Sequence, residues 1–225
     1  MATTVRRVID LSILLDENTQ TYPGDPEPKL SRAARLVPDG FNLLALHIGS
    51  QSGTHVDAPY HFIEEGPRLQ ECDLSLFTGP GVIVDATGHR DRQPITWEDI
   101  RPYEDRLRPG VIVLLSTGWS DRHLGTDRYY DHPFLDAEAC GRLVDVGVRT
   151  VGIDALNVDQ TTLPGAGEPA FPCHVRFLGA GGIFAENLRN LGAVDFEDPF
   201  FSLLPIRLGG DADGAPCRAV ALQLG

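Results

Sequence analysis

The segment SQSGTHVDAPYHF, residues 50–62, places several side chains that can bind a metal ion or carry a proton close together in the chain. If its first half is an extended strand, Gln51, His55 and Asp57 lie at alternate positions and point to one face. Gly53 has no side chain to fill the space between them. Because imidazole nitrogens and carboxylate oxygens are good ligands for Zn²⁺ and Mn²⁺, the segment predicts a metal site.

The end of the same segment adds a group that can transfer protons. Pro59 cannot donate a hydrogen bond to a neighbouring strand, so we expect the chain to turn there. His61, beyond the turn, can then fold back over the same pocket, where an imidazole can gain and lose a proton near neutral pH. A lone H-x-D pair is more often structural, but the fuller pattern H-x-D-x-P-x-H favours a metal site.

Two other patterns resemble different catalytic sites and are weaker. The sequence GSQSG at residues 49–53 has Gln51 where a nucleophile elbow, G-x-S-x-G, needs a serine. Cys173 and His174 are adjacent, but neighbouring side chains point apart on a strand and diverge by about 100° on a helix. A pair of nucleophile and base is therefore disfavoured at these two residues.

Apolar runs of strand length recur along the chain and predict the elements that position these groups. They occupy residues 8–15, 41–49, 81–87, 111–117, 150–155, 182–188, 201–208 and 217–224. Many of these runs are too continuous for a sheet with one face in water. We therefore expect both faces of the sheet to be covered.

Three segments have features of helices. Residues 95–107 begin with a Thr-x-x-Asp pattern, a weaker form of the capping box, although Pro102 interrupts the middle. Residues 135–147 have Asp136 as N-cap, an apolar stripe at helical spacing and a glycine at the end. Residues 172–180 are a weaker candidate. Because strands outnumber helices and the two are interspersed, we expect an α/β or α+β fold with a mixed sheet.

Length and composition limit the organisation and the function class. The chain has 225 residues and 42% hydrophobic content, which predicts one domain over residues 1–225. Acidic residues outnumber basic ones by 32 to 19, and the net charge of −13 disfavours binding to nucleic acid or to anionic lipid. No apolar run approaches the roughly 20 residues needed to span a membrane.

The N-terminal segment and the cysteines indicate the cellular compartment. Asp10 and Ser12 interrupt the apolar run near the N-terminus, which we interpret as a strand and not as a signal peptide. The four cysteines form no C-x-x-C pair and are expected to be free thiols. Free thiols without a secretion signal predict a cytoplasmic protein.

The sequence QSGTHVDAPYH resembles the H-x-G-T-H-x-D-x-P-x-H signature of the cyclase family of metal-dependent hydrolases, which includes bacterial kynurenine formamidase and isatin hydrolase. The resemblance continues over almost the whole chain and in the same order. The further segments that carry it are TYPGDP, LLSTGWS, YYDHPFLDAEA, VGIDALNVDQ, CHVRFLGAGGIFAENLRNL and PIRLGGDADGAPCRAVAL. It implies a mixed-sheet, barrel-like core with peripheral helices, the swivelling β/β/α type.

The resemblance also implies roles for particular residues. His55 corresponds to a ligand of a first metal site and His174 to a ligand of a second site. Asp57 corresponds to a ligand that bridges two ions, and Glu186 to a carboxylate that contacts both sites. His61 corresponds to the residue that donates and accepts the proton.

Two further positions concern the substrate and the first metal site. Tyr22 stands where the formamidases have an aromatic residue against the substrate. Gln51 replaces the first histidine of the signature, and an amide oxygen binds Zn²⁺ more weakly than imidazole and suits Mn²⁺ better. If Gln51 is a ligand, the site can hold two ions with a looser first site. Otherwise the site holds one ion through the other four ligands, or catalysis has been lost.

The function implied is that of a metal-dependent amidohydrolase of the EC 3.5 class, like arylformamidase or isatin hydrolase. It would cleave a small amide, formamide or lactam C–N bond through a metal-activated water, with one or two Zn or Mn ions per subunit. The resemblance also implies a homodimer or higher homo-oligomer acting on a small molecule. Two alternatives stay open: a cyclase acting on a polyketide-type intermediate, and an inactive ligand-binding homologue.

Overall fold

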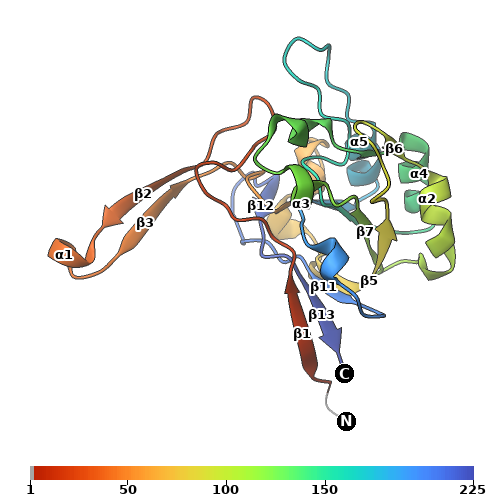
Figure 1. Cartoon of the computed structure of the whole chain (residues 1–225), viewed down its shortest axis with the longest axis horizontal. Helices are drawn as coiled ribbons and strands as arrows, with labels where there is room; N and C mark the ends of the chain where they lie inside the picture. Colours follow the sequence, from red (N-terminus) through yellow and green to blue (C-terminus); the bar gives the residue numbers. More distant parts are fainter. Residues whose placement is uncertain (1–2) are drawn as a thin grey trace.

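A nine-stranded sheet forms the centre of the molecule and brings distant segments side by side (Figure 1). The structure is a computed structural model that describes residues 3–225, so the first two residues of the N-terminal segment lie outside the described residues. From one edge to the other, the strands are β1 (Val5–Asp10), β13 (Val220–Leu224), β11 (Phe200–Ser202), β5 (Thr78–Asp85), β7 (Ile112–Ser116), β9 (Thr150–Ile153), β10 (Ile183–Glu186), β4 (His55–Asp57) and β12 (Gly214–Pro216).

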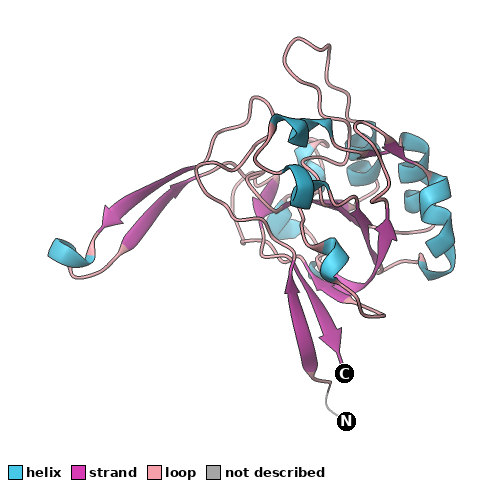
Figure 2. Ribbon diagram, in the orientation of Figure 1, coloured by secondary structure: helices cyan, strands magenta, loops and turns pink. Residues whose placement is uncertain are grey.

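The strand directions confirm the mixed α/β sheet that the sequence predicts. The pairs β5–β7, β7–β9 and β9–β10 are parallel, and the other pairs are antiparallel. The sheet curls into a half-barrel, and helices lie at its periphery (Figure 2). The barrel-like core with peripheral helices is therefore confirmed.

Short elements surround this sheet. Two smaller sheets pair β2 (Lys29–Ala34) with β3 (Leu43–His47) and β6 (Pro94–Ile95) with β8 (Phe134–Leu135). The α-helices are α1 (Leu36–Asp39), α2 (Trp97–Ile100), α3 (Trp119–His123), α4 (Ala137–Asp145) and α5 (Pro172–Gly179). The 3₁₀ helices are η1 (Pro59–His61), η2 (Leu69–Glu71), η3 (Leu74–Leu76), η4 (Arg101–Arg106), η5 (Asp127–Asp131) and η6 (Leu191–Ala193).

The central strands are buried on both faces, which explains their continuous apolar sequences. On β7, Val113 and Leu115 belong to one buried cluster, which also contains Phe177 of α5. Leu114, between them, points to the opposite face and joins a second cluster with Phe201 of β11. Successive strand side chains alternate in this way, so a strand between two covered faces is apolar at every position.

The predicted helices form where their capping residues are. Asp136 accepts hydrogen bonds from the backbone N–H groups of Glu138 and Ala139 and so begins α4. The predicted helix over 95–107 has only one α-helical turn, α2, and continues as the 3₁₀ helix η4. The change comes at Arg101, directly before Pro102, because proline has no N–H to continue α-helical hydrogen bonding.

The predicted strand over residues 50–57 is wrong in its first half. Residues 50–54 form a turn, and only His55–Asp57 are a strand. Gly53 has a φ of +68°, in the left-handed region that favours glycine, and this conformation breaks the extended chain. Alternation therefore places His55 and Asp57 on one face, but it does not place Gln51 there.

The apolar run at residues 41–49 does not enter the sheet. Among the described residues, its strand, β3, pairs only with β2, and the hairpin projects from the body of the molecule (Figures 1 and 2). Every residue of β3 is exposed, so the expected coverage of both faces is wrong for this strand.

The remaining predictions about the chain as a whole concern membranes and thiols. No helix among residues 3–225 is long and apolar enough to cross a membrane. The four cysteines are all free thiols, as predicted, and two of them, Cys140 and Cys173, are buried between the sheet and its helices.

Candidate metal centre and active site

Two antiparallel strands bring the first group of predicted ligands together. The register of β4 with β10 pairs His55 with Glu186 and Asp57 with Phe184. The Nε2 atom of His55 lies 3.4 Å from Oδ1 of Asp57 and 3.6 Å from Oε2 of Glu186. All three side chains are buried. Their donor atoms lie within 4.8 Å of one another, which allows them to contact one ion.

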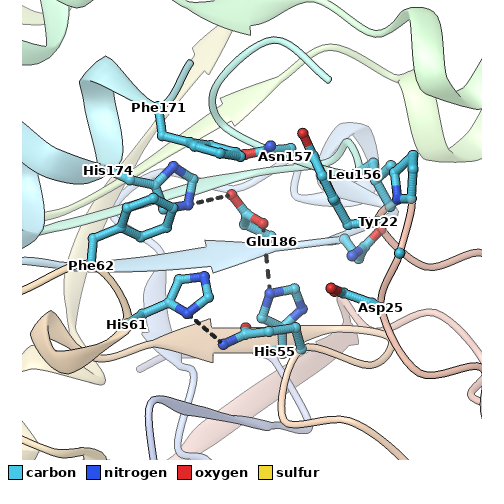
Figure 3. Close-up of a pocket in the computed structure, with 14 residues that line it drawn as sticks. Tyr22, Asp25, His55, His61, Phe62, Leu156, Asn157, Phe171, His174 and Glu186 are labelled. Atoms are coloured by element: carbon cyan, nitrogen blue, oxygen red, sulfur yellow. Dashed lines mark hydrogen bonds and ion pairs between the residues drawn. The ribbon is translucent and has the colours of Figure 1, made fainter. Parts of the chain in front are cut away.

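The helix α5 adds His174, which lies across Glu186 from His55 (Figure 3). Its Nε2 atom lies 3.6 Å from Oδ2 of Asp57 and 3.5 Å from Oε1 of Glu186. Each carboxylate therefore offers one oxygen to His55 and the other oxygen to His174. This arrangement can serve one ion or two ions bridged by carboxylates.

Asp159 fixes both the start of α5 and the orientation of His174. Its carboxylate accepts hydrogen bonds from the backbone N–H groups of Cys173 and His174, each at 3.0 Å, and so replaces a missing N-cap. The same carboxylate lies 2.7 Å from Nδ1 of His174. A carboxylate on Nδ1 of a histidine keeps the proton there and leaves Nε2 free to bind a metal.

The donor set fits a divalent cation. Both carboxylate oxygens of Asp57 are buried and have no hydrogen-bond partner within residues 3–225. The four distances of 3.4–3.6 Å are long for hydrogen bonds. Two ligands about 2.1 Å from one tetrahedral ion, however, lie about 3.4 Å apart. An ion between these atoms would satisfy oxygens that the protein alone leaves unsatisfied.

The charges at the site also favour a cation. Burial lowers the pKa of His174, but its hydrogen bond with Asp159 and the nearby carboxylates of Asp57 and Glu186 raise that pKa to about 10. The pKa of His55 is also raised, because Asp57 and Glu186 outweigh the effect of burial. The buried carboxylates thus favour the protonated form of both imidazoles. A divalent cation would supply the positive charge instead and displace these protons.

His61 lies at the edge of the same site, at the end of the 3₁₀ helix η1. Its Nδ1 atom is 2.9 Å from Oδ2 of Asp213, the residue that precedes β12. The other ring nitrogen is on the side facing Glu186 (Figure 3). Burial lowers the pKa of His61, but the hydrogen bond with Asp213 and the charge of Asp57 raise it above its ordinary value.

Gln51 reaches the pocket from the turn that precedes β4. Its Nε2 donates a hydrogen bond of 2.9 Å to Oδ2 of Asp213 and lies 3.4 Å from Nδ1 of His61. Its Oε1 is buried without a hydrogen-bond partner in the described part of the chain. The amide nitrogen is therefore directed toward the pair formed by His61 and Asp213.

A cavity of about 390 Å³ opens above these groups. Its walls are largely aromatic: Tyr22 and Phe62 lie on either side of Phe171, with ring centroids 5.8 and 5.0 Å from it. Among residues 3–225, no lysine or arginine lines the cavity, whereas the carboxylate of Asp25 does. The cavity can hold a small planar molecule next to the metal ligands.

The structure brings together all seven site residues that the sequence singles out, and it adds others. Asp213 and Asp25 were not predicted, although both lie in segments that resemble the family, GDADGAP and TYPGDP. Both segments are rich in glycine and proline, and the sequence alone indicates turns there. An acidic residue in a turn has many structural uses, so only its position against His61 distinguishes Asp213.

The fold and the buried donor set define an α/β protein with a site suited to a divalent cation. Residues 9–160 match the model of the cyclase family, described as "Putative cyclase". The chain is 29% identical over 219 residues to kynurenine formamidase of Geobacillus thermodenitrificans, covering 96% of this chain and 98% of that protein. It is 30% identical over 218 residues to kynurenine formamidase of Salinibacter ruber, covering 95% and 96%. The chain belongs to the cyclase family.

Solved structures share the same fold. Isatin hydrolase A from Labrenzia aggregata superimposes with a TM-score of 0.85 at 24% identity, covering 96% of this chain and 93% of that one. A structure described as a "predicted metal-dependent hydrolase from Bacillus stearothermophilus" has a TM-score of 0.76 at 27% identity and covers 99% of both chains.

Proposed function

We propose that this protein is a metal-dependent hydrolase that cleaves the C–N bond of a small amide, formamide or lactam. The observation that carries this proposal is the group of four buried metal-binding side chains beside the oriented imidazole of His61. The names of the relatives, kynurenine formamidase and isatin hydrolase, support the class of bond.

The ion would be held by His55, Asp57, His174 and Glu186. Two imidazole nitrogens and two carboxylates suit either Zn²⁺ or Mn²⁺. When bound, such an ion polarises a carbonyl group and lowers the pKa of water. The aromatic walls of the cavity would hold a planar substrate, with Tyr22 against it, and exclude bulk water from the reaction.

His61 would act as the general base and then as the general acid. Asp213 keeps a proton on Nδ1, so that the nitrogen facing the cavity is free to accept a proton from the attacking water. The same nitrogen then returns the proton to the departing substrate nitrogen. Asp213 would orient the imidazole and stabilise its protonated form, as the carboxylate does in other pairs of histidine and aspartate.

The test combines elemental analysis of the purified protein with a panel of aryl formamides, amides and lactams. We expect bound Zn or Mn, and hydrolysis that a chelator abolishes and the metal restores. His61→Ala should lower kcat by about 10²- to 10⁴-fold while the metal stays bound, because His61 moves protons and does not hold the ion. Metal-loaded protein that hydrolyses no member of the panel, or a His61→Ala variant with an unchanged rate, would overturn the proposal.

We also propose that the protein is a cytoplasmic homodimer or higher homo-oligomer. The hairpin of β2 and β3 supports self-association, because it projects from the body and carries exposed apolar side chains (Figure 1). The most exposed of these are Leu36, Val37, Phe41, Leu43, Leu44 and Leu46. Exposed apolar side chains gathered on one projecting segment mark a site of protein contact.

A further inference from the structure

The side chain of Gln51 is fixed between the backbone of Gly214 and the carboxylate of Asp213. A Cβ atom added at Gly214 would lie 2.8 Å from Nε2 and 3.2 Å from Oε1 of Gln51, so the amide lies in the space that this glycine leaves free. Asp213 is itself fixed, because its carbonyl accepts a hydrogen bond of 2.8 Å from the N–H of Ala58. The amide therefore meets a carboxylate that is already anchored to the end of β4.

The hydrogen bonds identify which end of the amide faces the carboxylate. Oδ2 of Asp213 accepts from Nε2 of Gln51 and from Nδ1 of His61, each at 2.9 Å. A flipped amide would direct its oxygen at this carboxylate oxygen, and two acceptors repel each other. Burial raises the pKa of Asp213, but hydrogen bonds from His61, Ser50 and Gln51 lower it to about 2.

We propose that Gln51 is a positioning residue that acts through Asp213 on His61, in place of the metal ligand found at this position of the family signature. This inference rests on the proposed function, because it gives His61 the acid–base role. Two donors on one oxygen restrict the carboxylate to a single rotamer, and that rotamer fixes the plane of the imidazole. The four buried ligands would then hold the ion without Gln51.

The first test is the metal content and the kinetics of Gln51→Leu and Gln51→Glu. Both variants remove the N–H donor, whereas the second keeps an oxygen that a metal ligand would need. We expect both to bind as much metal per chain as the original protein, with KM little changed and kcat about 10-fold or more lower. The matched control Gln93→Leu alters an exposed glutamine outside the cavity and should leave the metal content, KM and kcat unchanged.

The second test is a double-mutant cycle. If Gln51 acts through Asp213, then Gln51→Leu combined with Asp213→Asn should lower kcat no further than Asp213→Asn alone. Losses that multiply would overturn the inference. A loss of metal from Gln51→Leu as large as the loss from His55→Ala would also overturn it, because Gln51 would then be a ligand.

The third readout does not depend on turnover and so separates this inference from the proposed function. In zinc-loaded protein with ¹⁵N-labelled histidine, the proton on Nδ1 of His61 should give a resonance that Asp213→Asn abolishes. We expect Gln51→Leu to shift this resonance or to speed its exchange with water, and Gln93→Leu to leave it unchanged. An identical resonance in Gln51→Leu would overturn the inference even if the substrate panel succeeds, and a shifted one would support it even if the panel fails.

Discussion

At the residue scale, the three histidines of the site share one arrangement. Each has its Nδ1 atom against an oxygen of the protein, which leaves Nε2 free to face the cavity. The oxygens are the carbonyl of Gly53 for His55 at 2.8 Å, Oδ2 of Asp213 for His61 at 2.9 Å, and Oδ2 of Asp159 for His174 at 2.7 Å. The surrounding oxygens therefore set which nitrogen can bind an ion or a proton.

Asp213→Asn is expected to move the pH dependence of the reaction. The hydrogen bond with Asp213 raises the pKa of His61 above 6.5, so the unprotonated base forms only at pH values above this. Without the carboxylate, that pKa falls, and the acidic limb of kcat/KM should move to lower pH while its plateau drops. Measurement of kcat/KM across pH 5–9 checks this, and a limb that stays in place or moves upward would contradict it.

The same pair affects stability with a defined sign. Because the folded pKa of His61 is raised, its contribution to stability is complete below pH 6.5 and is lost as the pH rises through the folded value. The stability difference between the original protein and Asp213→Asn should therefore shrink as the pH increases above 6.5.

Asp159→Asn is expected to weaken metal binding. An amide on Nδ1 of His174 holds its tautomer and orientation less firmly than the carboxylate, and such changes cost about 10- to 100-fold in metal affinity. Competition with a chromophoric chelator measures the effect. Asp136→Asn, which alters the cap of α4 away from the cavity, is the control and should bind metal as before. Equal affinity in both variants would show that Asp159 has only a structural role.

At the scale of elements, strand pairing determines the geometry of the site. His55 and Glu186 are far apart in the chain and become cross-strand partners only through the register of β4 and β10. Because side chains alternate along a strand, a shift of one residue would turn His55 away from Glu186. Close packing of neighbouring strands keeps this register.

Gly81→Ala tests that packing at β5. A Cβ atom at this position would lie 2.3 Å from Cε2 of Phe201 and 2.6 Å from the carbonyl oxygen of Ile112. Relief of these contacts requires the strands to move, so we expect the free energy of unfolding to fall by about 1–3 kcal/mol. Urea denaturation measures it. At Gly88, an added Cβ atom would have no non-neighbouring atom of the described residues within 4 Å, so Gly88→Ala should be nearly neutral. An equal loss of stability in both variants would refute the packing explanation.

At the scale of the whole molecule, the projecting hairpin is the feature that the body does not use. On this hairpin, Leu44 of β3 is 51% exposed, and β2 is the only strand that pairs with β3 within residues 3–225. If two copies bury these hairpins against each other, Leu44→Glu should shift the protein toward monomer, because burying an unpaired charge in an apolar interface is costly. Light scattering after gel filtration measures the mass.

The control for this prediction is Leu74→Glu, which changes an equally apolar residue, 67% exposed, outside the hairpin. It should leave the mass unchanged. A protein that is already monomeric, or two variants that dissociate to the same extent, would contradict the role of the hairpin.

The predictions of a single domain over residues 1–225 and of a cytoplasmic location do not depend on this test and stay predictions.

The sequence by itself determined the kind of chemistry and the class of fold. His55 and Asp57 are two residues apart on one strand, so local alternation suffices to put both side chains on one face. Continuous apolar runs were enough to predict strands covered on both faces, because burial on two sides leaves no polar position.

Only the tertiary structure decided which distant groups meet at the site. Asp213 meets His61 because β12 pairs with β4, and Gln51 faces Asp213 because a turn at Gly53 replaces the expected strand. Nothing in residues 41–49 distinguishes an exposed hairpin from a core strand. Contacts between residues far apart in the chain depend on how the sheet packs as a whole, and local propensity does not contain that information.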